Sequence, residues 1–490
     1  MRSSPLIALF LLRLAAGQTA PWDATLLAAG QTAPWDATLH LHDPATAAQF
    51  NAKCLDGSRG GFYFRGASSP SAATKWKFHF QGGGWCFKDN DCVGRSKTLL
   101  GSSSFWTPTL SALWAPEGAG FYGLMAANDT SLNPFGDWNF VWLAYCDGSS
   151  QTSDRTDPVV VGNATLHYRG RALLDAHLFE LERLHGFLST ASEVIISGTS
   201  AGGMSTYMHS SFIRTQLRAP GARLVAVPDA GFWWDVPRFG GGGSIWVDNM
   251  RVATPSSAWN ATLRGNLGAC LRAPPGGNAL LCYTQPNAYA YLDVPTFVVQ
   301  SMVDPANFGI CWGLPCSLKG NTAGSCNAGE LAAIQSFSAW MVGNITQAQS
   351  AFGARDGHFI TSCNQHEETC RQFDWWGISI NGRTMNSCVR LPAPSALAPP
   401  PARCVLTCAT PAPSSGRFTL GTTTYPARTQ PSWTGRGPLM QRAATARARM
   451  ALAGKQLMFE EKNVSPPPPP LIFLKPLAAR PPRAYAFRPT

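Results

Sequence analysis

Residues 194–206 read VIISGTSAGGMST, and this stretch decides the fold. Three β-branched apolar residues run into a Gly-Thr-Ser-Ala-Gly turn, and the residues after the turn suit a helix. A G-x-S-x-G pattern between a strand and a helix is typical of a nucleophile elbow, where a serine occupies a strained turn. The pattern therefore makes Ser200 a candidate nucleophile, against the alternative of an ordinary glycine-flanked serine.

Further apolar stretches on both sides of the elbow predict strands that alternate with helical segments. The strand-like stretches are 75–87, 138–148, 193–198, 222–231 and 295–304, and the main helical stretch is 168–187. This alternation predicts an α/β domain over residues 45–390, with a mostly parallel sheet flanked by helices. In such folds the functional residues gather at the carboxyl ends of the strands.

A nucleophilic serine needs a histidine base, and the base needs an orienting acid. In α/β-hydrolases the chain order is serine, acid, histidine, and only His209, His358 and His366 follow Ser200. His209 lies on the helix that leaves the elbow, where packing or surface exposure explains it better. His366 is favoured because Cys363 and Cys370 flank it and would fix a loop, while His358 stays open as an alternative.

The acid is predicted at the end of the apolar stretch 295–304. Asp304 closes that stretch, so its carboxylate would face the same sheet edge as the elbow. The alternative is a purely structural role, in which Asp304 only caps the following turn. Three other residues remain weaker candidates for the orienting acid: Asp229, Asp293 and Asp356.

A glycine-rich loop upstream, QGGG at 81–84, suits an oxyanion hole. Backbone N–H groups can approach a developing oxyanion there without a Cβ in the way. The N–H of Ala201, directly after the serine, would be another donor.

The positive charge of the chain belongs to its C-terminal hundred residues. Residues 391–490 hold 13 of the 39 Lys and Arg residues and two acids, so residues 1–390 carry 26 bases and 26 acids. The same region holds 19 of the 38 prolines. We expect a Pro-rich, basic, disordered tail rather than a nucleic-acid-binding surface.

The N-terminus predicts secretion. Residues 1–17 resemble a signal peptide, and no segment is apolar over the length that spans a membrane. The 13-residue sequence LAAGQTAPWDATL occurs as two tandem copies over 14–39, which lie mostly in the N-terminal segment 18–44. We assign no function to this repeat. Fourteen cysteines suit an oxidising compartment and allow seven bridges, with Cys86–Cys92 and Cys311–Cys316 near enough for local ones. Glycosylation sequons at five asparagines agree with secretion: Asn128, Asn163, Asn260, Asn344 and Asn463.

Several motifs follow one another along the chain: CLDGSRGGFYF (54–64), QGGGWC (81–86), YCDGSS (145–150), GTSAGG (198–203), PDAGFWWD (228–235) and HEE (366–368). In this order they resemble the motifs of the pectin acetylesterase family, which also includes Notum. The resemblance spans about residues 45–390. It implies a secreted, disulfide-stabilised α/β-hydrolase-like esterase that needs no metal or other cofactor. Carried over by motif, its catalytic residues would be Ser200, Asp304 and His366, and its oxyanion donors Gly83, Gly84 and Ala201. A substrate pocket would include Trp85, Phe232 and Trp233, unless these rings, with Trp234, are core packing.

The expected reaction is hydrolysis of a carboxylic ester. The small Gly84 resembles the plant acetylesterase form of the motif and favours removal of O-acetyl groups from a cell-wall polysaccharide such as pectin. Gln81 stands where relatives often have Glu, which changes local hydrogen bonding. Two alternatives stay open: removal of a longer acyl group from a protein, as in Notum, and a secreted glycoprotein that binds polysaccharide without catalysis.

Overall fold

The computed structural model describes residues 36–114, 123–127, 133–319, 323–352 and 355–369, with the short pieces 379–380, 383–385 and 403–405. All of them belong to one compact unit, Met1–Gly421. The predicted signal peptide, the first copy of the 13-residue repeat, Asn128, Cys370, Asn463 and the remainder of the C-terminal region lie outside the described residues.

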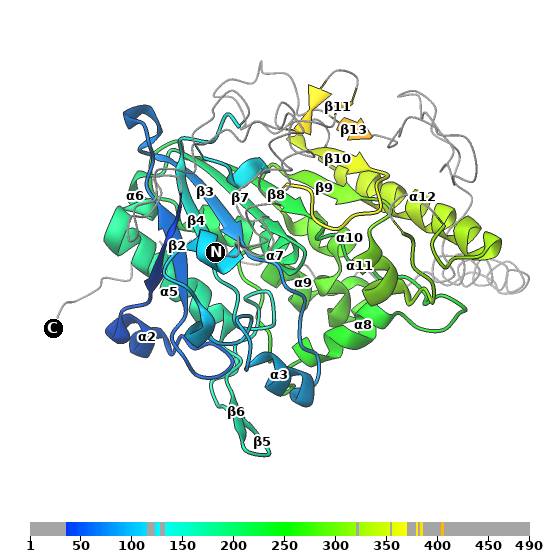
Figure 1. Cartoon of the computed structure of the whole chain (residues 1–490), viewed down its shortest axis with the longest axis horizontal. Helices are drawn as coiled ribbons and strands as arrows, with labels where there is room; N and C mark the ends of the chain where they lie inside the picture. The colour runs from blue at the N-terminus through cyan, green and yellow to red at the C-terminus, as the bar shows by residue number, and fades with distance from the viewer. Residues whose placement is uncertain are drawn as a thin grey trace, which may run out of the picture. The chain divides into compact units, whose positions relative to one another are not determined.

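A mixed, mainly parallel sheet forms the centre of this unit (Figure 1). Its strands are, in spatial order, β1 (Thr38–Leu41), β2 (Gly61–Arg65), β4 (Asn139–Leu143), β3 (Lys75–Phe80), β7 (Glu193–Thr199), β8 (Arg223–Asp229), β9 (Phe297–Ser301), β10 (Gly357–Thr361) and β13 (Arg403–Val405). The pairs β1–β2 and β2–β4 are antiparallel, and every later pair is parallel. The expected mostly parallel sheet is confirmed. Two small hairpins stand apart from it: β5 (Val159–Val161) with β6 (Ala164–Leu166), and β11 (Ser379–Ile380) with β12 (Arg383–Thr384).

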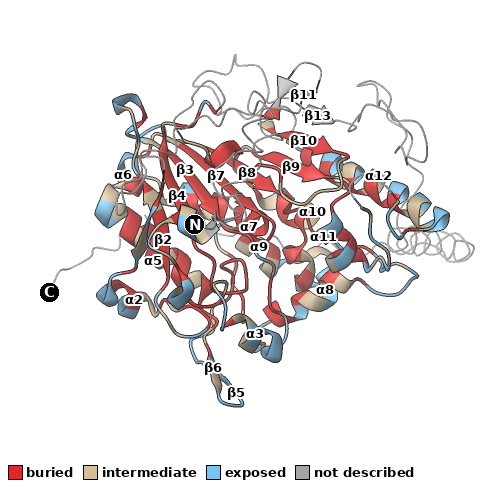
Figure 2. Cartoon of the chain, viewed as in Figure 1, coloured by how far each residue is buried: buried red, intermediate tan, exposed pale blue. Residues whose placement is uncertain are grey.

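The central strands are buried on both faces, which explains their nearly unbroken apolar sequences (Figure 2). In β7, Val194 and Ile196 enter one apolar cluster, while Ile195 between them enters the cluster on the opposite face. This alternation follows from the period of two along a strand.

The helices flank this sheet (Figure 1). They are α2 (Pro44–Phe50), α3 (Asp89–Arg95), α4 (Leu110–Trp114), α5 (Gly170–His185), α6 (Phe187–Thr190), α7 (Ala201–Gln216), α8 (Ile245–Asn249), α9 (Leu267–Arg272), α10 (Gln285–Ala288), α11 (Pro305–Asn307) and α12 (Ala328–Ser350). Single turns of other helix types are η2 (Pro70–Ala72), η3 (Ser103–Phe105), η4 (Gly123–Met125), η5 (Met250–Ala253), η6 (Pro275–Gly277), η7 (Ala279–Tyr283), η8 (Tyr289–Tyr291) and η9 (Phe308–Trp312).

Helix α5 is the helix predicted over 168–187, and its sequence explains its position. Leu174, Leu178 and Leu181 recur at helical spacing and are buried in the same apolar cluster as Val194 and Ile196. The helix ends at Gly186, whose φ of 64° suits a C-terminal glycine cap. Helix α5 therefore packs on the face of the sheet that carries Val194 and Ile196.

The sheet extends beyond the predicted domain boundaries at both ends. Strand β1 lies before residue 45 and pairs with β2 in register, with Thr38 opposite Phe64. Strand β13 lies inside the segment expected to be a disordered tail, yet it pairs in parallel with β10. Both strands are only three or four residues long, and so short a run carries little periodicity to detect.

Four disulfides join described cysteines: Cys54–Cys146, Cys86–Cys92, Cys270–Cys282 and Cys316–Cys326. The predicted Cys86–Cys92 bridge is confirmed. The predicted Cys311–Cys316 bridge is wrong, because Cys311 is a buried free thiol on η9 and Cys316 pairs with Cys326 instead. The full set of seven bridges is therefore excluded as well.

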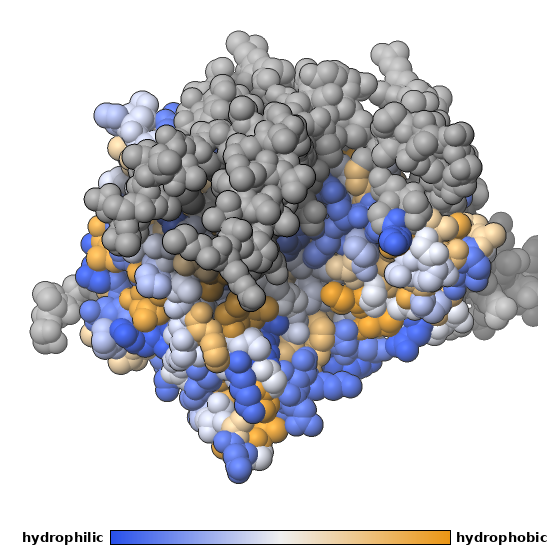
Figure 3. Space-filling model, in the orientation of Figure 1, coloured by the Kyte–Doolittle hydropathy of each residue, from blue (hydrophilic) through white to orange (hydrophobic). Residues whose placement is uncertain are grey.

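The large hydrophobic side chains that are exposed belong to four different segments of the described chain. They are Leu41, Phe105, Val160 and Leu184. On the face seen in Figure 3 the hydrophobic areas are correspondingly broken up by hydrophilic ones. Among the helices that the structure describes, none has the length and apolarity required to cross a bilayer.

Candidate active site

Ser200 sits on a strained turn between β7 and α7. Its φ is 57° and its ψ −118°, a conformation that is costly for a residue with a side chain. The turn is tight because Gly202 and Gly198 pack directly against neighbouring backbone. A Cβ built on Gly202 would lie 2.0 Å from the Phe80 carbonyl oxygen, and one on Gly198 would lie 2.2 Å from the Gly202 carbonyl oxygen. The geometry is that of a nucleophile elbow.

His366 and Asp304 are brought together although they lie 62 residues apart in the chain. Nδ1 of His366 is 2.8 Å from Oδ2 of Asp304, whose side chain is fully buried. Asp304 follows β9 and also caps α11, since its Oδ1 accepts a hydrogen bond from the Ala306 N–H at 2.8 Å. The same carboxylate thus both contacts His366 and caps the following turn. Nδ1 is therefore the ring nitrogen that faces the buried carboxylate, and the hydrogen bond there sets the orientation of the imidazole.

The other histidines and acids considered from the sequence are engaged elsewhere. His358 is buried within β10 and its Nδ1 lies 2.7 Å from Gln349 Oε1 on α12. His209 is buried on α7 and its Nε2 lies 2.9 Å from the Ser150 carbonyl oxygen. Asp293 pairs with Arg214 on the far end of α7, and Asp356 accepts hydrogen bonds from the Tyr289 hydroxyl and the Thr296 N–H.

Asp229, at the end of β8, connects the elbow to the loop that carries His366. Its backbone carbonyl accepts from the Ser200 N–H at 2.9 Å. Its carboxylate Oδ2 accepts from the N–H groups of Glu368 and Thr369, at 2.7 and 2.6 Å, and from the Thr369 hydroxyl. The sequence marked Asp229 only as a weaker choice for the acid, whereas the structure makes it an anchor for the histidine loop.

The glycine loop lies at the same edge of the sheet. A Cβ built on Gly82 would lie 2.7 Å from the Thr199 carbonyl oxygen and 2.8 Å from Glu367 Oε1. Gly82 therefore fits between the residue before Ser200 and the residue after His366. Gly83 and Gly84 follow with φ values of 133° and 64°, and Ala201 is the first residue of α7. Loop, elbow and histidine converge as the chain order suggested.

The aromatic residues predicted for a substrate pocket are buried in the largest apolar cluster. Trp85, Trp233 and Trp246 pack against one another with ring centroids 4.9–5.4 Å apart. Phe232 is also fully buried, beside Tyr207. Of these rings, Trp233 reaches the site most directly, since its centroid is 6.2 Å from that of His366 in an edge-on arrangement.

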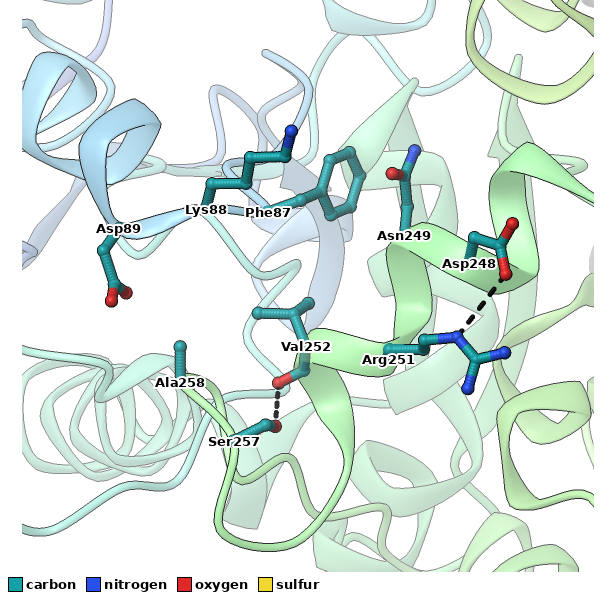
Figure 4. Close-up of a pocket in the computed structure, with 9 residues that line it drawn as sticks. All are labelled: Phe87, Lys88, Asp89, Asp248, Asn249, Arg251, Val252, Ser257 and Ala258. Carbon is teal, nitrogen blue, oxygen red and sulfur yellow. Dashed lines mark hydrogen bonds and ion pairs between the residues drawn. The ribbon is translucent and has the colours of Figure 1, made fainter.

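An open pocket with both polar and apolar lining side chains begins three residues after the glycine loop (Figure 4). Phe87 and Lys88 line it on one side, and Asp248, Asn249 and Arg251 on the other, with Arg251 directed at Asp248. No motif in the sequence pointed to this pocket, because its two walls are about 160 residues apart in the chain.

A group of residues with metal-ligand chemistry occurs elsewhere, at Cys316, Cys326 and Glu330. The two sulfurs are joined in a disulfide, and Glu330 Oε2 accepts the Asn327 N–H at the start of α12. Oxidised sulfurs and a capping carboxylate do not suit a metal ion, because a cysteine ligand has to be a thiolate.

Taken together, an elbow serine, a buried aspartate bonded to a histidine, and a glycine loop on an α/β sheet define the class of α/β-hydrolase esterases. A model of the family described as pectinacetylesterase matches residues 35–390, and the chain belongs to this family. It is a carboxylic ester hydrolase.

Individual relatives agree with this assignment. Pectin acetylesterase 5 of Arabidopsis thaliana is 27% identical over 350 residues, which cover 68% of this chain and 75% of that protein. The palmitoleoyl-protein carboxylesterase Notum of Schmidtea mediterranea is 25% identical, over 69% of this chain and 59% of that protein. The crystal structure of the Wnt deacylase Notum from Drosophila has the same fold, with a TM-score of 0.58 and 21% identity over 72% of this chain and 91% of that one.

Proposed function

We propose that the enzyme is a secreted serine esterase that removes O-acetyl groups from a polysaccharide, pectin being the first candidate, with Ser200, His366 and Asp304 as its catalytic residues. The observation that carries the proposal is the hydrogen bond between His366 Nδ1 and the buried Asp304 at the sheet edge where Ser200 occupies a strained elbow. A buried acid, a histidine and a serine in this order are the parts of a hydrolytic triad.

In the proposed mechanism His366 Nε2 takes the proton of the Ser200 hydroxyl as Oγ attacks the ester carbonyl carbon. The negative charge moves to the carbonyl oxygen, where the N–H groups of Gly83, Gly84 and Ala201 stabilise it. The bond between the carbonyl carbon and the sugar oxygen then breaks, and His366 gives its proton to this oxygen, which leaves as a sugar hydroxyl. Water, deprotonated by His366, then attacks the acetyl carbonyl carbon. The bond to Ser200 Oγ breaks, His366 returns the proton to Oγ, and acetate leaves.

The packing around His366 supports a short acyl group. The indole of Trp233 lies edge-on to the histidine ring, and Trp85 and Trp246 pack against this indole from behind. A polymer could extend instead into the open pocket beside Phe87 and Lys88 (Figure 4). The four disulfides support a secreted enzyme, because such bonds persist in oxidising compartments.

Acyl-chain length separates this proposal from its alternative, a deacylase for longer chains on proteins. We expect a higher kcat/KM for p-nitrophenyl acetate than for p-nitrophenyl octanoate, by about tenfold or more, because one misfit methylene changes transition-state binding by about 1–3 kcal/mol. Acetate release from acetylated pectins and xylans then identifies the polymer, with Ser200→Ala as the blank. A preference for octanoate would replace the polysaccharide proposal with the protein-deacylase one.

The charges around His366 lead to a prediction of pH dependence. Burial by itself lowers the pKa of His366, but the carboxylates of Asp304, Glu367 and Asp229 outweigh it and raise this pKa to about 9. Only neutral imidazole can accept the serine proton, so kcat/KM should rise with pH and level off above about pH 9. Glu367→Gln removes one of the charges that stabilise the imidazolium, and the rising limb should therefore move to lower pH.

The measurement is the initial rate on p-nitrophenyl acetate from pH 6 to about 10, corrected for spontaneous hydrolysis. Glu182→Gln, on the distant end of α5, serves as the control and should leave the profile in place. An acidic limb that stays put or moves to higher pH in Glu367→Gln would contradict the assignment of His366 as the base.

A further inference from the structure

We infer that Arg95 is a positioning residue for the oxyanion hole: its guanidinium holds the outer face of the glycine loop and thereby aims the Gly84 N–H at the reacting carbonyl oxygen. The inference rests on the proposed function, in which Gly84 is a donor to the oxyanion. Arg95 touches neither substrate nor reacting atoms in this account.

The contact that matters joins Arg95 to the carbonyl of Gly83. Nη1 of Arg95, the last residue of α3, donates to this oxygen at 2.8 Å. The Gly83 carbonyl and the Gly84 N–H belong to one planar trans peptide unit, so they point in opposite directions. Holding the carbonyl toward Arg95 therefore turns the Gly84 N–H to the opposite side of the loop.

The loop needs such an anchor because it has little conformational preference of its own. Gly83 and Gly84 both have φ values in the region that glycine enters freely and other residues avoid. The same freedom would let either peptide unit rotate in the absence of outside contacts. An N–H that points away even part of the time contributes less to stabilising the oxyanion.

Tyr145 holds the next carbonyl of the loop from the same side. Its hydroxyl donates to the Gly84 carbonyl oxygen at 2.9 Å and accepts from the Ser150 N–H at 3.1 Å. Burial raises the pKa of Tyr145, so the hydroxyl keeps its proton and remains a donor. The guanidinium carbon of Arg95 lies 4.8 Å from the centre of the Tyr145 ring, which places both anchors in one stack.

A second hydrogen bond holds Arg95, and a disulfide ties its helix to the loop. Its Nε donates to the Leu100 carbonyl oxygen at 3.0 Å, and the Cys86–Cys92 disulfide ties the end of the glycine loop to helix α3. The arginine and the loop that it holds are thus covalently connected over a short distance. This arrangement would also stabilise the local fold, so the test has to separate aiming the N–H from stability alone.

The test compares Arg95→Ala with Arg355→Ala in the full-length enzyme. Arg355 is the matched control because it likewise donates to a backbone carbonyl, that of Leu292, and lies over an aromatic ring, that of Phe352, at a distance from the glycine loop. For Arg95→Ala we expect kcat/KM on p-nitrophenyl acetate to fall by about 100-fold, the lower end of the loss measured for one missing oxyanion donor, with KM changed less than about threefold. Affinity for a trifluoromethyl ketone, which forms an oxyanion on the serine, should fall by a similar factor.

Chemical rescue gives a readout that a purely structural role would not move. Methylguanidinium in the assay should restore about tenfold of the lost kcat/KM in Arg95→Ala, because it can occupy the vacated site and bond the Gly83 carbonyl. It should leave Arg355→Ala and the unchanged enzyme unaffected. If Arg95→Ala does not fold, Arg95→Lys keeps the charge without the planar fork and should show an intermediate loss with unchanged KM.

Full kcat/KM in folded Arg95→Ala, or a loss without any effect of methylguanidinium and without weaker ketone binding, would overturn the inference. The proposed function is judged separately by Ser200→Ala. An inactive Ser200→Ala beside a fully active Arg95→Ala would reject the role of Arg95 alone, whereas an active Ser200→Ala would reject the triad.

Discussion

Ser200→Ala is expected to lower kcat for p-nitrophenyl acetate by about 10⁶-fold, the loss that accompanies removal of a serine nucleophile from a hydrolytic triad. The alanine has no oxygen that could form the acyl-enzyme, so hydrolysis would depend on the remaining oxyanion donors and on substrate binding. Those groups leave a residual acceleration over water, which is why the loss is finite.

The substitution should leave the fold intact. Alanine removes a single oxygen and takes over the same φ of 57°, so the strain of the elbow stays nearly as it is. Ser210→Ala is a matched control, because Ser210 is a buried serine on α7, the helix that follows Ser200, and its hydroxyl donates to the Thr206 carbonyl. We expect it to keep its activity within about twofold, as a neutral hydrogen bond is worth only about 1 kcal/mol. Turnover by Ser200→Ala above one per cent of the starting rate, in a protein with unchanged melting temperature, would reject Ser200 as the nucleophile.

Asp304→Asn is expected to lower kcat by about 10⁴-fold. Asp304 now accepts hydrogen bonds from His366 Nδ1, Gln300 Nε2 and the Ala306 N–H. An asparagine has one acceptor oxygen, so its NH₂ group must face either the imidazole or a donor that the carboxylate now satisfies. With the NH₂ group toward the imidazole, the proton on Nδ1 loses its acceptor. In either orientation the negative charge that stabilises the imidazolium is lost.

A second signature distinguishes this role from simple loss of stability. Because Asp304 is the largest cause that raises the pKa of His366, the residual activity of Asp304→Asn should rise at lower pH than in the unchanged enzyme. Asp293→Asn is the control, since Asp293 pairs with Arg214 outside the site. Equal kcat values for the two variants, or a residual profile with an unmoved acidic limb, would count against Asp304 as the orienting acid.

The central strands and the main helix could be predicted from the sequence because each follows a simple physical rule. Strands such as β7 and β9 are buried on both faces and read as apolar runs, and α5 shows a leucine stripe that ends at a glycine. The elbow and the aspartate after β9 followed from these assignments, because the carboxyl ends of parallel strands share one edge.

What the sequence did not reveal depends on contacts between distant segments. Asp229 looks like any acid after a strand, and its bonds to Glu368 and Thr369 exist only once β8 and the histidine loop are adjacent. The wrong Cys311–Cys316 pairing has a similar cause: short spacing favours a bridge, but Cys311 faces the core beside Asn307 while Cys316 lies near Cys326. Arg95 likewise gains its place only when α3 folds against the glycine loop.

Labelling by a fluorophosphonate tests the central claim most directly, because this reagent forms a stable adduct only with an activated serine. Peptide mass spectrometry after stoichiometric inactivation should locate one adduct, on Ser200. Ser200→Ala should remain unlabelled and Asp304→Asn should react much more slowly. A folded enzyme that resists the reagent, or an adduct on another serine that accompanies the loss of activity, would contradict the account.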